Sequence, residues 1–467
     1  MILHIEKIIQ WCTYLFLFSL PWQTILIVQE RFVNGIKWEY GTIGFYATEV
    51  LGWIIVLLFM VWYVKKRNWK LEIRNFTWSK DRVFILSLLL FVAYGVLSSF
   101  FAGDRTLAFQ HAQWVMLGSL LFLLFYIGPV KPKSALWAFV LGSLPVSMLG
   151  IWQFLSQSTF ASTLFGLSQH IVFEPGTSII QSADIGRWLR AYGSFSHPNV
   201  FGGYLVFAIG SVLLLSFSAE KWKRVALQAI VVLQSAALFF TFSRSAFVAL
   251  AIVLLFYCFI VVHNAKGCGE TTQPHPNPPL KNGRGRARLF TFVATIAVVF
   301  AVFSFIYFPL LQTRFAASSS HEVASITDRV AGYSDAWHLF QNNWVIGVGG
   351  GNYTYALMQM NPNMPVWWYQ PVHVVPLLFV VEEGAIGLAF FIFICIRFFK
   401  YQISNIKYQD LAEPMLFAIC YLLFVAPLLL LDHYLWSSFT GIILLVVSSG
   451  LYIRSTRDEI FPHIVPI

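Results

Sequence analysis

Long apolar runs recur along almost the whole of the 467-residue chain. Hydrophobic residues make up 58% of it and charged residues only 11%, whereas an ordinary soluble domain is about 25% charged. A helix needs roughly 20 apolar residues to cross a bilayer. The pattern excludes a soluble globular protein and predicts an all-α polytopic membrane protein with about 12 transmembrane helices.

The candidate membrane spans are apolar runs separated by short polar segments. They cover residues 9–28, 43–64, 83–101, 112–129, 135–156, 199–217, 225–242, 246–263, 289–311, 375–399, 414–432 and 438–453. No small-residue cleavage site follows the first run, so we interpret it as a retained helix and not as a signal peptide. A large external loop is expected between spans 9 and 10.

The formal net charge of +10 is interpreted as an orientation signal. With both termini in the cytoplasm, most of the 31 lysines and arginines lie on the inner side, as the positive-inside rule requires. We therefore expect no nucleic-acid partner. The basic residues left outside are Arg31, Lys37, Arg105, Arg187, Arg190, Arg244, Arg314 and Arg329. All but Lys37 are arginines, whose planar fork suits phosphate oxygens. For Arg31 and Arg105, anchoring of a helix end at the membrane surface is favoured instead.

Loop lengths divide the chain into an N-terminal five-span membrane region (residues 1–156), a second membrane region (157–453) and a cytoplasmic tail (454–467). The second region has two long external loops, at about 157–198 and 312–372. It also contains a Pro-, Gly- and Asn-rich stretch at about 264–288, which predicts a disordered cytoplasmic linker.

The larger external loop contains a predicted amphipathic surface helix. Ser325 followed by Asp328 forms a capping pattern, and apolar residues then recur at helical spacing. Arg329 would lie in the first turn, where the helix dipole disfavours a cation. This misfit indicates an anionic partner outside the protein, with an ordinary surface arginine as the alternative.

The same loop continues through a glycine-rich stretch, Gly347–Asn352, which lacks the Lys-Ser/Thr of a nucleotide loop and is interpreted as a turn with close backbone approach. His373 follows at the mouth of a span, where a histidine can act as a general base, with a purely structural histidine as the alternative. Inside that span, Glu383 is costly to bury and indicates either a functional pairing with an external arginine or a buried structural hydrogen bond.

Arg244 lies in Thr241-Phe-Ser-Arg-Ser245, a very tight external turn between two apolar runs. It is either an arginine snorkelling from a helix end or a fixed guanidinium at the depth of a lipid diphosphate. The sequence has no H-E-x-x-H motif and no cluster with metal-ligand spacing, so we expect no metal and no cofactor.

Taken in order, these stretches resemble the O-antigen ligase and O-antigen polymerase family of membrane glycan-transfer proteins. The resemblance spans roughly residues 185–440, and the first five spans share only its hydropathy. The stretches that carry it are Gly193-Ser-Phe-Ser-His-Pro-Asn199, Thr241–Ser245, Arg329 with Trp337, Gly347-Val-Gly with Tyr353, His373, Glu383-Gly384 with Gly387, and Asp432-His-Tyr-Leu-Trp436.

The resemblance implies a GT-C-like helical bundle in the cytoplasmic (inner) membrane with its active site on the external, periplasmic face. It implies an undecaprenyl-diphosphate-linked glycan as donor and a lipid, glycan or protein as acceptor. Arg244 and Arg329 would hold the diphosphate, and His373 would take the acceptor proton. Arg190 is a further candidate for the phosphate site, with Glu383 and Asn199 in supporting roles.

One position departs from the family pattern, because Val374 follows the histidine where the family often has asparagine. A glycosyl diphosphate is already activated, so arginines that stabilise developing charge fit a metal-independent transfer. The alternatives are a polymerase of the same family, a lipid-linked glycan transporter or flippase, and an assembly scaffold. A transporter predicts charged residues along several spans and interrupted helices in two halves, whereas the unusual polar residues here gather in external loops.

Overall fold

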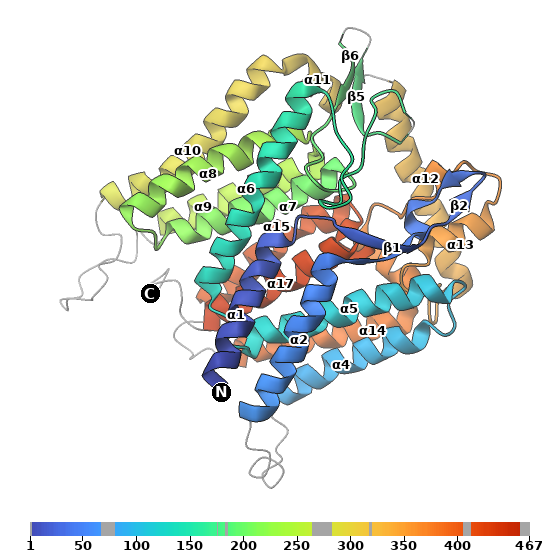
Figure 1. Ribbon diagram of the computed structural model, residues 1–467, viewed down its shortest axis with the longest axis horizontal. Coiled ribbons are helices and arrows are strands. Elements are labelled where there is room, and N and C mark those ends of the chain that lie inside the picture. The colour runs from blue at the N-terminus through green and yellow to red at the C-terminus, as the bar shows by residue number, and fades with distance from the viewer. Residues whose placement is uncertain are drawn as a thin grey trace.

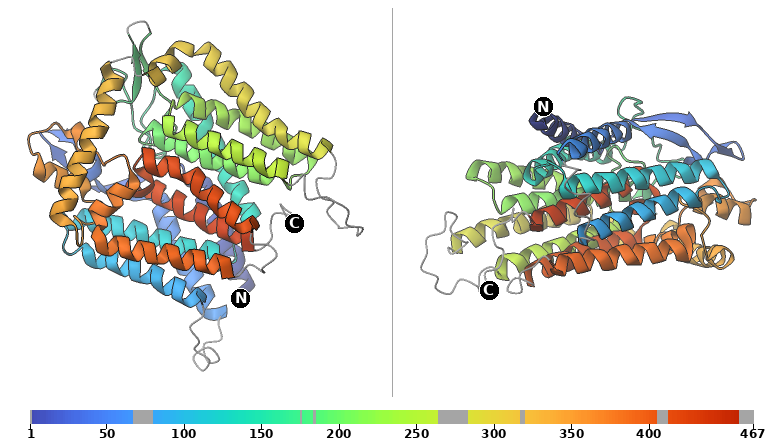
Figure 2. Two further views of the ribbon diagram at one scale, coloured as in Figure 1. Left: turned by 180° about the vertical axis from the view of Figure 1, so that it is seen from behind. Right: turned by 90° about the horizontal axis from the view of Figure 1, so that it is seen from below.

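The computed structural model describes residues 2–66, 80–174, 176–182, 185–263, 283–316, 320–404 and 412–457. Within these ranges the chain is mostly helical, and long helices pack side by side (Figures 1 and 2). The helices that coincide with the predicted runs are α1 (Ile2–Ser19), α2 (Ala47–Lys66), α4 (Lys80–Ser98), α5 (Arg105–Ile127), α6 (Pro132–Ser156), α7 (Pro198–Ser216), α8 (Lys221–Phe240), α9 (Arg244–His263), α10 (Gly283–Ile306), α14 (Val375–Ser404), α15 (Ala412–Leu431) and α17 (Phe439–Arg457).

Six of the described helices are long and apolar enough to cross a membrane: α2, α5, α6, α7, α8 and the Val375–Arg397 part of α14. A seventh is obtained if α10 and α11 (Phe308–Ala316), which meet at a bend of 93°, count as one broken span. The chain is therefore a multi-pass membrane protein. The total of about 12 spans stays a prediction.

The first two predicted spans are partly wrong, because each apolar run contains a strand as well as a helix. α1 ends at Ser19, and β1 (Ile25–Gln29) pairs antiparallel with β4 (Ile43–Tyr46), which leads directly into α2. Pro21 offers no backbone N–H for a continuing helix, and the β-branched residues that follow favour a strand. The result is an apolar ribbon next to the helices (Figure 1).

Between the paired strands lie β2 (Phe32–Val33), β3 (Ile36–Lys37) and a 3-10 turn, η1 (Glu39–Gly41). A second hairpin, β5 (Ile179–Ser182) and β6 (Gly186–Leu189), forms in the loop before α7. The remaining elements are α12 (Ser320–Asn343), α13 (Tyr353–Met360), η2 (Val366–Trp368) and α16 (Tyr434–Ser437). Most of these short elements lie at the end of the bundle that carries β1 and α12 (Figure 2).

The predicted surface helix of the large loop exists but begins earlier than expected. It is α12, which starts at Ser320 and not at Ser325. Arg329 therefore lies in the third turn and not in the first. Because the dipole effect fades beyond the first turn, the predicted dipole misfit of Arg329 is wrong.

Two predicted segments fall largely outside the described residues. Of the linker at 264–288, residues 264–282 lie outside, and residues 283–288 form the start of α10, so that end of the predicted linker is helical. Of the tail at 454–467, residues 454–457 continue α17 and the remainder lies outside.

Candidate active site

Three histidines that come from distant parts of the sequence meet near the ends of α7, α14 and α16. The rings of His373 and His433 lie with their centroids 5.0 Å apart in an edge-to-face arrangement. His197, the N-cap of α7, lies close enough for both to influence its charge. His373 precedes α14 by two residues, and His433 is the N-cap of α16. We call these three residues the histidine cluster.

The hydrogen bonds of His373 define which ring nitrogen can act as a base. Its Nδ1 lies 3.1 Å from the carbonyl oxygen of Pro371. Because a carbonyl only accepts, Nδ1 carries the proton and donates it, which leaves Nε2 with a lone pair. The Nδ1 of His433 is likewise engaged, at 2.7 Å from the Oγ of Ser437.

The surroundings keep the cluster neutral. Burial lowers the pKa of His373; Asp432 opposes this shift and Arg329 adds to it. Burial, followed by the neighbouring His373, lowers the pKa of His433 to about 3. Burial and then the charge of Arg190 hold the pKa of His197 well below its usual range. Neutral imidazoles at neutral pH are able to accept a proton.

A chain of buried hydrogen bonds connects the hairpin segment to the segment before α16. Arg190, only 2% exposed, donates from Nη2 to Asn199 Oδ1 at 2.7 Å, and Asn199 donates from Nδ2 to Asp432 Oδ2 at 2.8 Å. The Nε of Arg190 donates to the Thr241 carbonyl at 2.7 Å, and its Nη1 donates to Ser178 Oγ at 2.6 Å. The predicted residues Arg190 and Asn199 are thus neighbours within one polar network.

The turn that carries Arg244 is bound by two other arginines. It is a tight turn between α8 and α9, with Phe242 in the left-handed region at φ 47°. Arg190 binds the carbonyl of Thr241, and Arg314, from α11, donates to the carbonyl of Phe242 at 3.2 Å. Arg244 itself is half-buried at the start of α9. The prediction of a tight turn at this position is confirmed.

Arg314, predicted only as one of the external arginines suited to phosphate, is a neighbour of the site. It is 6% exposed, and its charge contributes to lowering the pKa of His197. Arg329 is half-buried on α12, and its positive charge contributes to lowering the pKa of both His373 and His433. Its Nε is buried and has no hydrogen-bond partner among the described residues, so it is a donor that a bound anion could use.

Tyr40, in η1, is a member of the site that no sequence motif indicated. Its ring centroid lies 6.1 Å from that of His433. Burial, then Glu39, then Asp432 raise the pKa of its hydroxyl, so it stays protonated. Asp432 and His433 belong to the motif Asp432–Trp436, but only the structure shows that they lie next to His373.

Glu383 lies apart from the histidine cluster. It occupies the break in α14 at Gly384, where φ is 65°, and it is 3% exposed. A Cβ on Gly350 would lie 2.9 Å from Glu383 Oε1 and 2.6 Å from His111 Nδ1, which shows what surrounds the carboxyl group. The part of the chain that the structure describes shows no hydrogen bond from an arginine to this carboxyl group.

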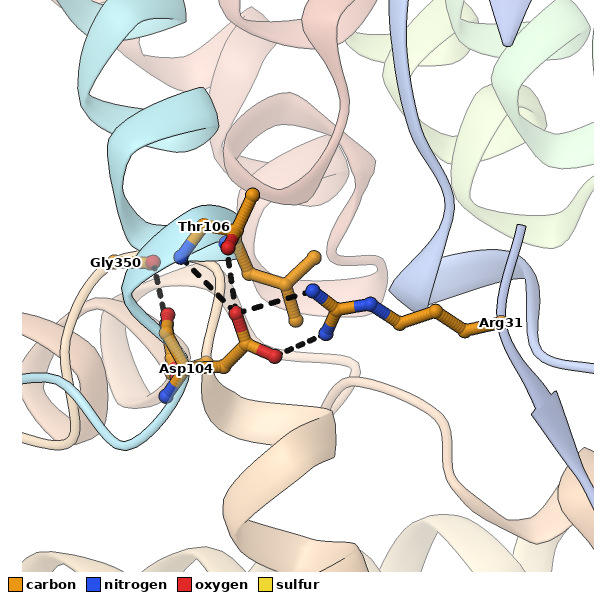
Figure 3. A network of polar contacts seen from close by, with 6 residues as sticks. Arg31, Asp104, Thr106 and Gly350 are labelled. Atoms are coloured by element: carbon orange, nitrogen blue, oxygen red, sulfur yellow. Dashed lines mark hydrogen bonds and ion pairs between the residues drawn. The ribbon is translucent and has the colours of Figure 1, made fainter. Parts of the chain in front are cut away.

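The glycine-rich stretch forms a turn with close backbone approach, as predicted. Gly347, Gly349 and Gly351 have φ of 74°, 95° and 69°, and a Cβ on Gly347 would lie 2.2 Å from the Glu382 carbonyl oxygen. Asn352 joins this turn to the start of α5, because its side chain both accepts from the backbone N–H of Asp104 and donates to its carbonyl. The same Asp104 caps α5 and pairs with Arg31 (Figure 3).

Within the described ranges, no group of three or more His, Cys, Asp or Glu residues has an arrangement that could hold a metal ion. Residues 229–392 match a family model described as O-antigen ligase. The matched segment contains Arg244, Arg329, His373 and Glu383, and it confirms the family resemblance for the motifs within it, whereas Gly193–Asn199 and Asp432–Trp436 lie outside the match. No curated protein matches the chain.

Proposed function

We propose that this chain, whose residues 229–392 match the O-antigen ligase family model, transfers a glycan from an undecaprenyl-diphosphate carrier to an acceptor on the outer face of the cytoplasmic membrane. The family implies glycan transfer from a lipid-linked donor in the bacterial inner membrane. The observation that supports the residue roles is the neutral histidine cluster beside Asp432 and Arg329. We assign both termini to the cytoplasm, so that this cluster faces the external side.

In the proposed reaction His373 is the general base. Its Nε2 takes the proton of an acceptor hydroxyl, and that oxygen attacks the anomeric carbon of the donor sugar. The bond between this carbon and the diphosphate oxygen breaks, and the lipid diphosphate leaves with the electron pair. Asp432 favours the protonated form of His373 that arises, because its negative charge raises the pKa of that imidazole.

The leaving diphosphate needs positive charge that is already in place. Arg329 and Arg244 supply it in this proposal, since fixed guanidinium groups stabilise developing phosphate charge without a metal ion. Arg190 adds charge but is held by Thr241, Ser178 and Asn199. We therefore assign both residues mainly to positioning: Arg190 holds the turn before Arg244, and Asn199 holds Asp432.

The test uses purified protein in liposomes that contain a lipid-diphosphate-linked oligosaccharide and candidate acceptors. Release of free lipid diphosphate is compared between the native chain and His373→Ala. His338→Ala is the matched control, because this histidine is exposed on α12. Loss with His373→Ala and retention with His338→Ala support the proposal. Release that survives His373→Ala removes the assigned base.

The size of the product separates a ligase from a polymerase. One addition per acceptor supports the ligase, which the motif resemblance favours, and a ladder of products supports the polymerase. Movement of the lipid between leaflets without any release would identify a transporter and refute the transfer reaction.

A second variant set tests the diphosphate site. Arg244→Ala and Arg329→Ala should each abolish transfer while the protein still inserts into the membrane and accumulates. Arg187→Ala is the control, because this external arginine donates from Nε to the Val172 carbonyl at 2.9 Å in the loop before α7. Normal transfer by both arginine variants would refute the proposed site.

A further inference from the structure

The two adjacent glutamates at the break in α14 differ in their hydrogen bonds. Glu382 accepts from the backbone N–H of Tyr353 at 3.2 Å and from Trp436 Nε1 at 2.8 Å. Glu383 is equally buried, at 3% exposed, but its Oε2 has no hydrogen-bond partner among the described residues. An unsatisfied carboxyl oxygen inside a membrane protein is costly, so a polar ligand is expected beside it.

His111, on α5, is the polar side chain nearest to the position where a Cβ on Gly350 would approach Glu383. It is 3% exposed, and its Nε2 lies 3.0 Å from the carbonyl oxygen of Trp436. Because the carbonyl can only accept, Nε2 carries the hydrogen and Nδ1 has a lone pair. The two groups that face each other are therefore an acceptor nitrogen and a carboxyl group.

A small cavity joins these two groups. It is lined by Phe91, Gly95, Ala108, His111, Gly350 and Glu383, among others, and has room for about one water molecule. Gly350 contributes no side chain, and a Cβ there would lie 2.6 Å from His111 Nδ1 and 2.9 Å from Glu383 Oε1. Both polar groups thus border the same space, whose other lining residues are apolar or glycine and which has room for about one water.

We propose that a water molecule bound in this cavity bridges Glu383 and His111, and that this bridge positions the segment carrying Asp432 and His433. The water donates one hydrogen to His111 Nδ1 and hydrogen-bonds with the Glu383 carboxyl group through its other hydrogen or its oxygen. Glu383 and His111 are positioning residues in this proposal, since neither touches the substrate. The catalytic consequence rests on the proposed function; the water site does not.

Trp436 transmits the effect because two residues, Glu382 and His111, hold it in place. Its indole Nε1 donates to Glu382, its carbonyl accepts from His111, and its ring meets the His111 ring edge-to-face at 4.7 Å. Trp436 belongs to α16, a single turn that begins directly after His433. A shift of Trp436 therefore moves His433 and Asp432 relative to His373, and small misplacements of reacting groups reduce rates strongly.

The water site is tested first by high-resolution cryo-electron microscopy of the full chain in lipid nanodiscs. The expected result is density between the Glu383 carboxyl group and His111 Nδ1 in the native protein and none in Glu383→Leu. Direct contact between the two side chains, or a cavity filled by a neighbouring side chain, would overturn the proposal. This measurement does not depend on activity.

The positioning role is tested with a cavity-filling pair. Gly350 lines the cavity, and a Cβ added there would lie 2.6 Å from His111 Nδ1 and 2.9 Å from Glu383 Oε1, so Gly350→Ala places a methyl group where the water would bind. Gly210, on α7, lines a different cavity and has open space at its Cβ position, so Gly210→Ala is the control. We expect Gly350→Ala to lower kcat at least about tenfold with little change in the donor KM, and Gly210→Ala to keep kcat.

A conservative replacement separates positioning from simple packing. Glu383→Gln keeps the shape and still hydrogen-bonds a water, so it should retain kcat within a few-fold, whereas Glu383→Leu should lose as much as Gly350→Ala. Equal loss in Gln and Leu variants, or full activity in Gly350→Ala, would overturn the positioning role. If native protein releases no lipid diphosphate at all, the proposed function fails, and the nanodisc maps still decide the water site.

Discussion

The amide of Asn199 donates a hydrogen bond from Nδ2 to Asp432 Oδ2 at 2.8 Å, across 233 positions of the sequence. The same amide accepts from Arg190 through its oxygen. One neutral side chain thus separates and bridges a buried cation and a buried anion. The negative charge of Asp432 raises the pKa of both His373 and His433. Because Asn199 holds Asp432 in place, the position of Asn199 also affects these two pKa values.

Replacing this bridge should be costly. Asn199→Leu has a similar volume but leaves Arg190 Nη2 and Asp432 Oδ2 without the partner they share, so we expect a loss of about 3 kcal/mol in the free energy of unfolding. Thermal and denaturant unfolding in detergent measure it. In the control, Gln228→Leu removes an exposed hydrogen bond to Thr291 and a part-buried one from Thr295, and it should change stability by less than about 0.5 kcal/mol. Equal effects in the two variants would contradict this assignment.

The charge of Arg329 should determine the pH at which transfer declines. Its guanidinium lowers the pKa of His373, so Arg329→Ala should raise that pKa, which NMR titration of the His373 imidazole measures in a variant expected to lack transfer. Arg329→Lys keeps the charge but not the planar fork. It should keep the pH–rate profile near its native position and lose rate by roughly 10²-fold, because one lost donor at a developing oxyanion costs about that much. An unchanged His373 pKa in Arg329→Ala, or an Arg329→Lys profile from pH 5 to 8 that is displaced from the native profile, would refute the coupling.

Much of the helical framework follows from hydropathy, because apolar runs of membrane length leave the backbone few alternatives. The ribbon of β1 and β4 does not, since its residues are as apolar as those of the adjoining helices. Only the pairing of Ile25–Gln29 with Ile43–Tyr46 identifies it. Periodicity cannot distinguish a short apolar strand from the end of a helix.

The site is partly predictable for a similar reason. His373 and Arg244 could be singled out because each stands in a recognisable motif at a loop. The contact of His373 with His433, and of His433 with Tyr40, depends on how distant segments pack. Glu383 illustrates the limit, because the break at Gly384 places its carboxyl group next to His111 of α5, which no local pattern indicates.

Acidification should destabilise the folded protein through the histidine cluster. Each of His197, His373 and His433 has a folded-state pKa below its usual value of 6.5. Below pH 6.5 the unfolded chain therefore binds more protons than the folded one, and stability falls as pH decreases. The contribution is fully present above 6.5 and is lost at about 1.4 kcal/mol per pH unit for each such histidine, down to its folded-state pKa.

Unfolding in detergent between pH 7.5 and 5 measures this slope. His433→Gln removes one titrating group whose folded-state pKa is about 3, so its slope should be smaller by about the contribution of one histidine. The exposed His338 provides the control through His338→Gln. A slope that is unchanged in His433→Gln would show that this histidine is not kept neutral by the fold.

The break in α14 should tolerate no side chain at Gly384. This residue has φ 65° and ψ −171°, and a Cβ there would lie 2.5 Å from both the Gly347 nitrogen and the Val345 carbonyl oxygen. Backbone contacts cannot move aside as a flexible side chain can, so Gly384→Ala should cost more than about 2 kcal/mol and reduce the folded yield. Gly332→Ala is the control, because Gly332 lies in α12 with nothing near its Cβ position, and there alanine should stabilise by roughly 0.5–1 kcal/mol. Unfolding temperatures of the two variants check both signs. A Gly384→Ala protein as stable as the native chain would mean that α14 runs straight through this position, and the placement of Glu383 beside His111 would fall with it.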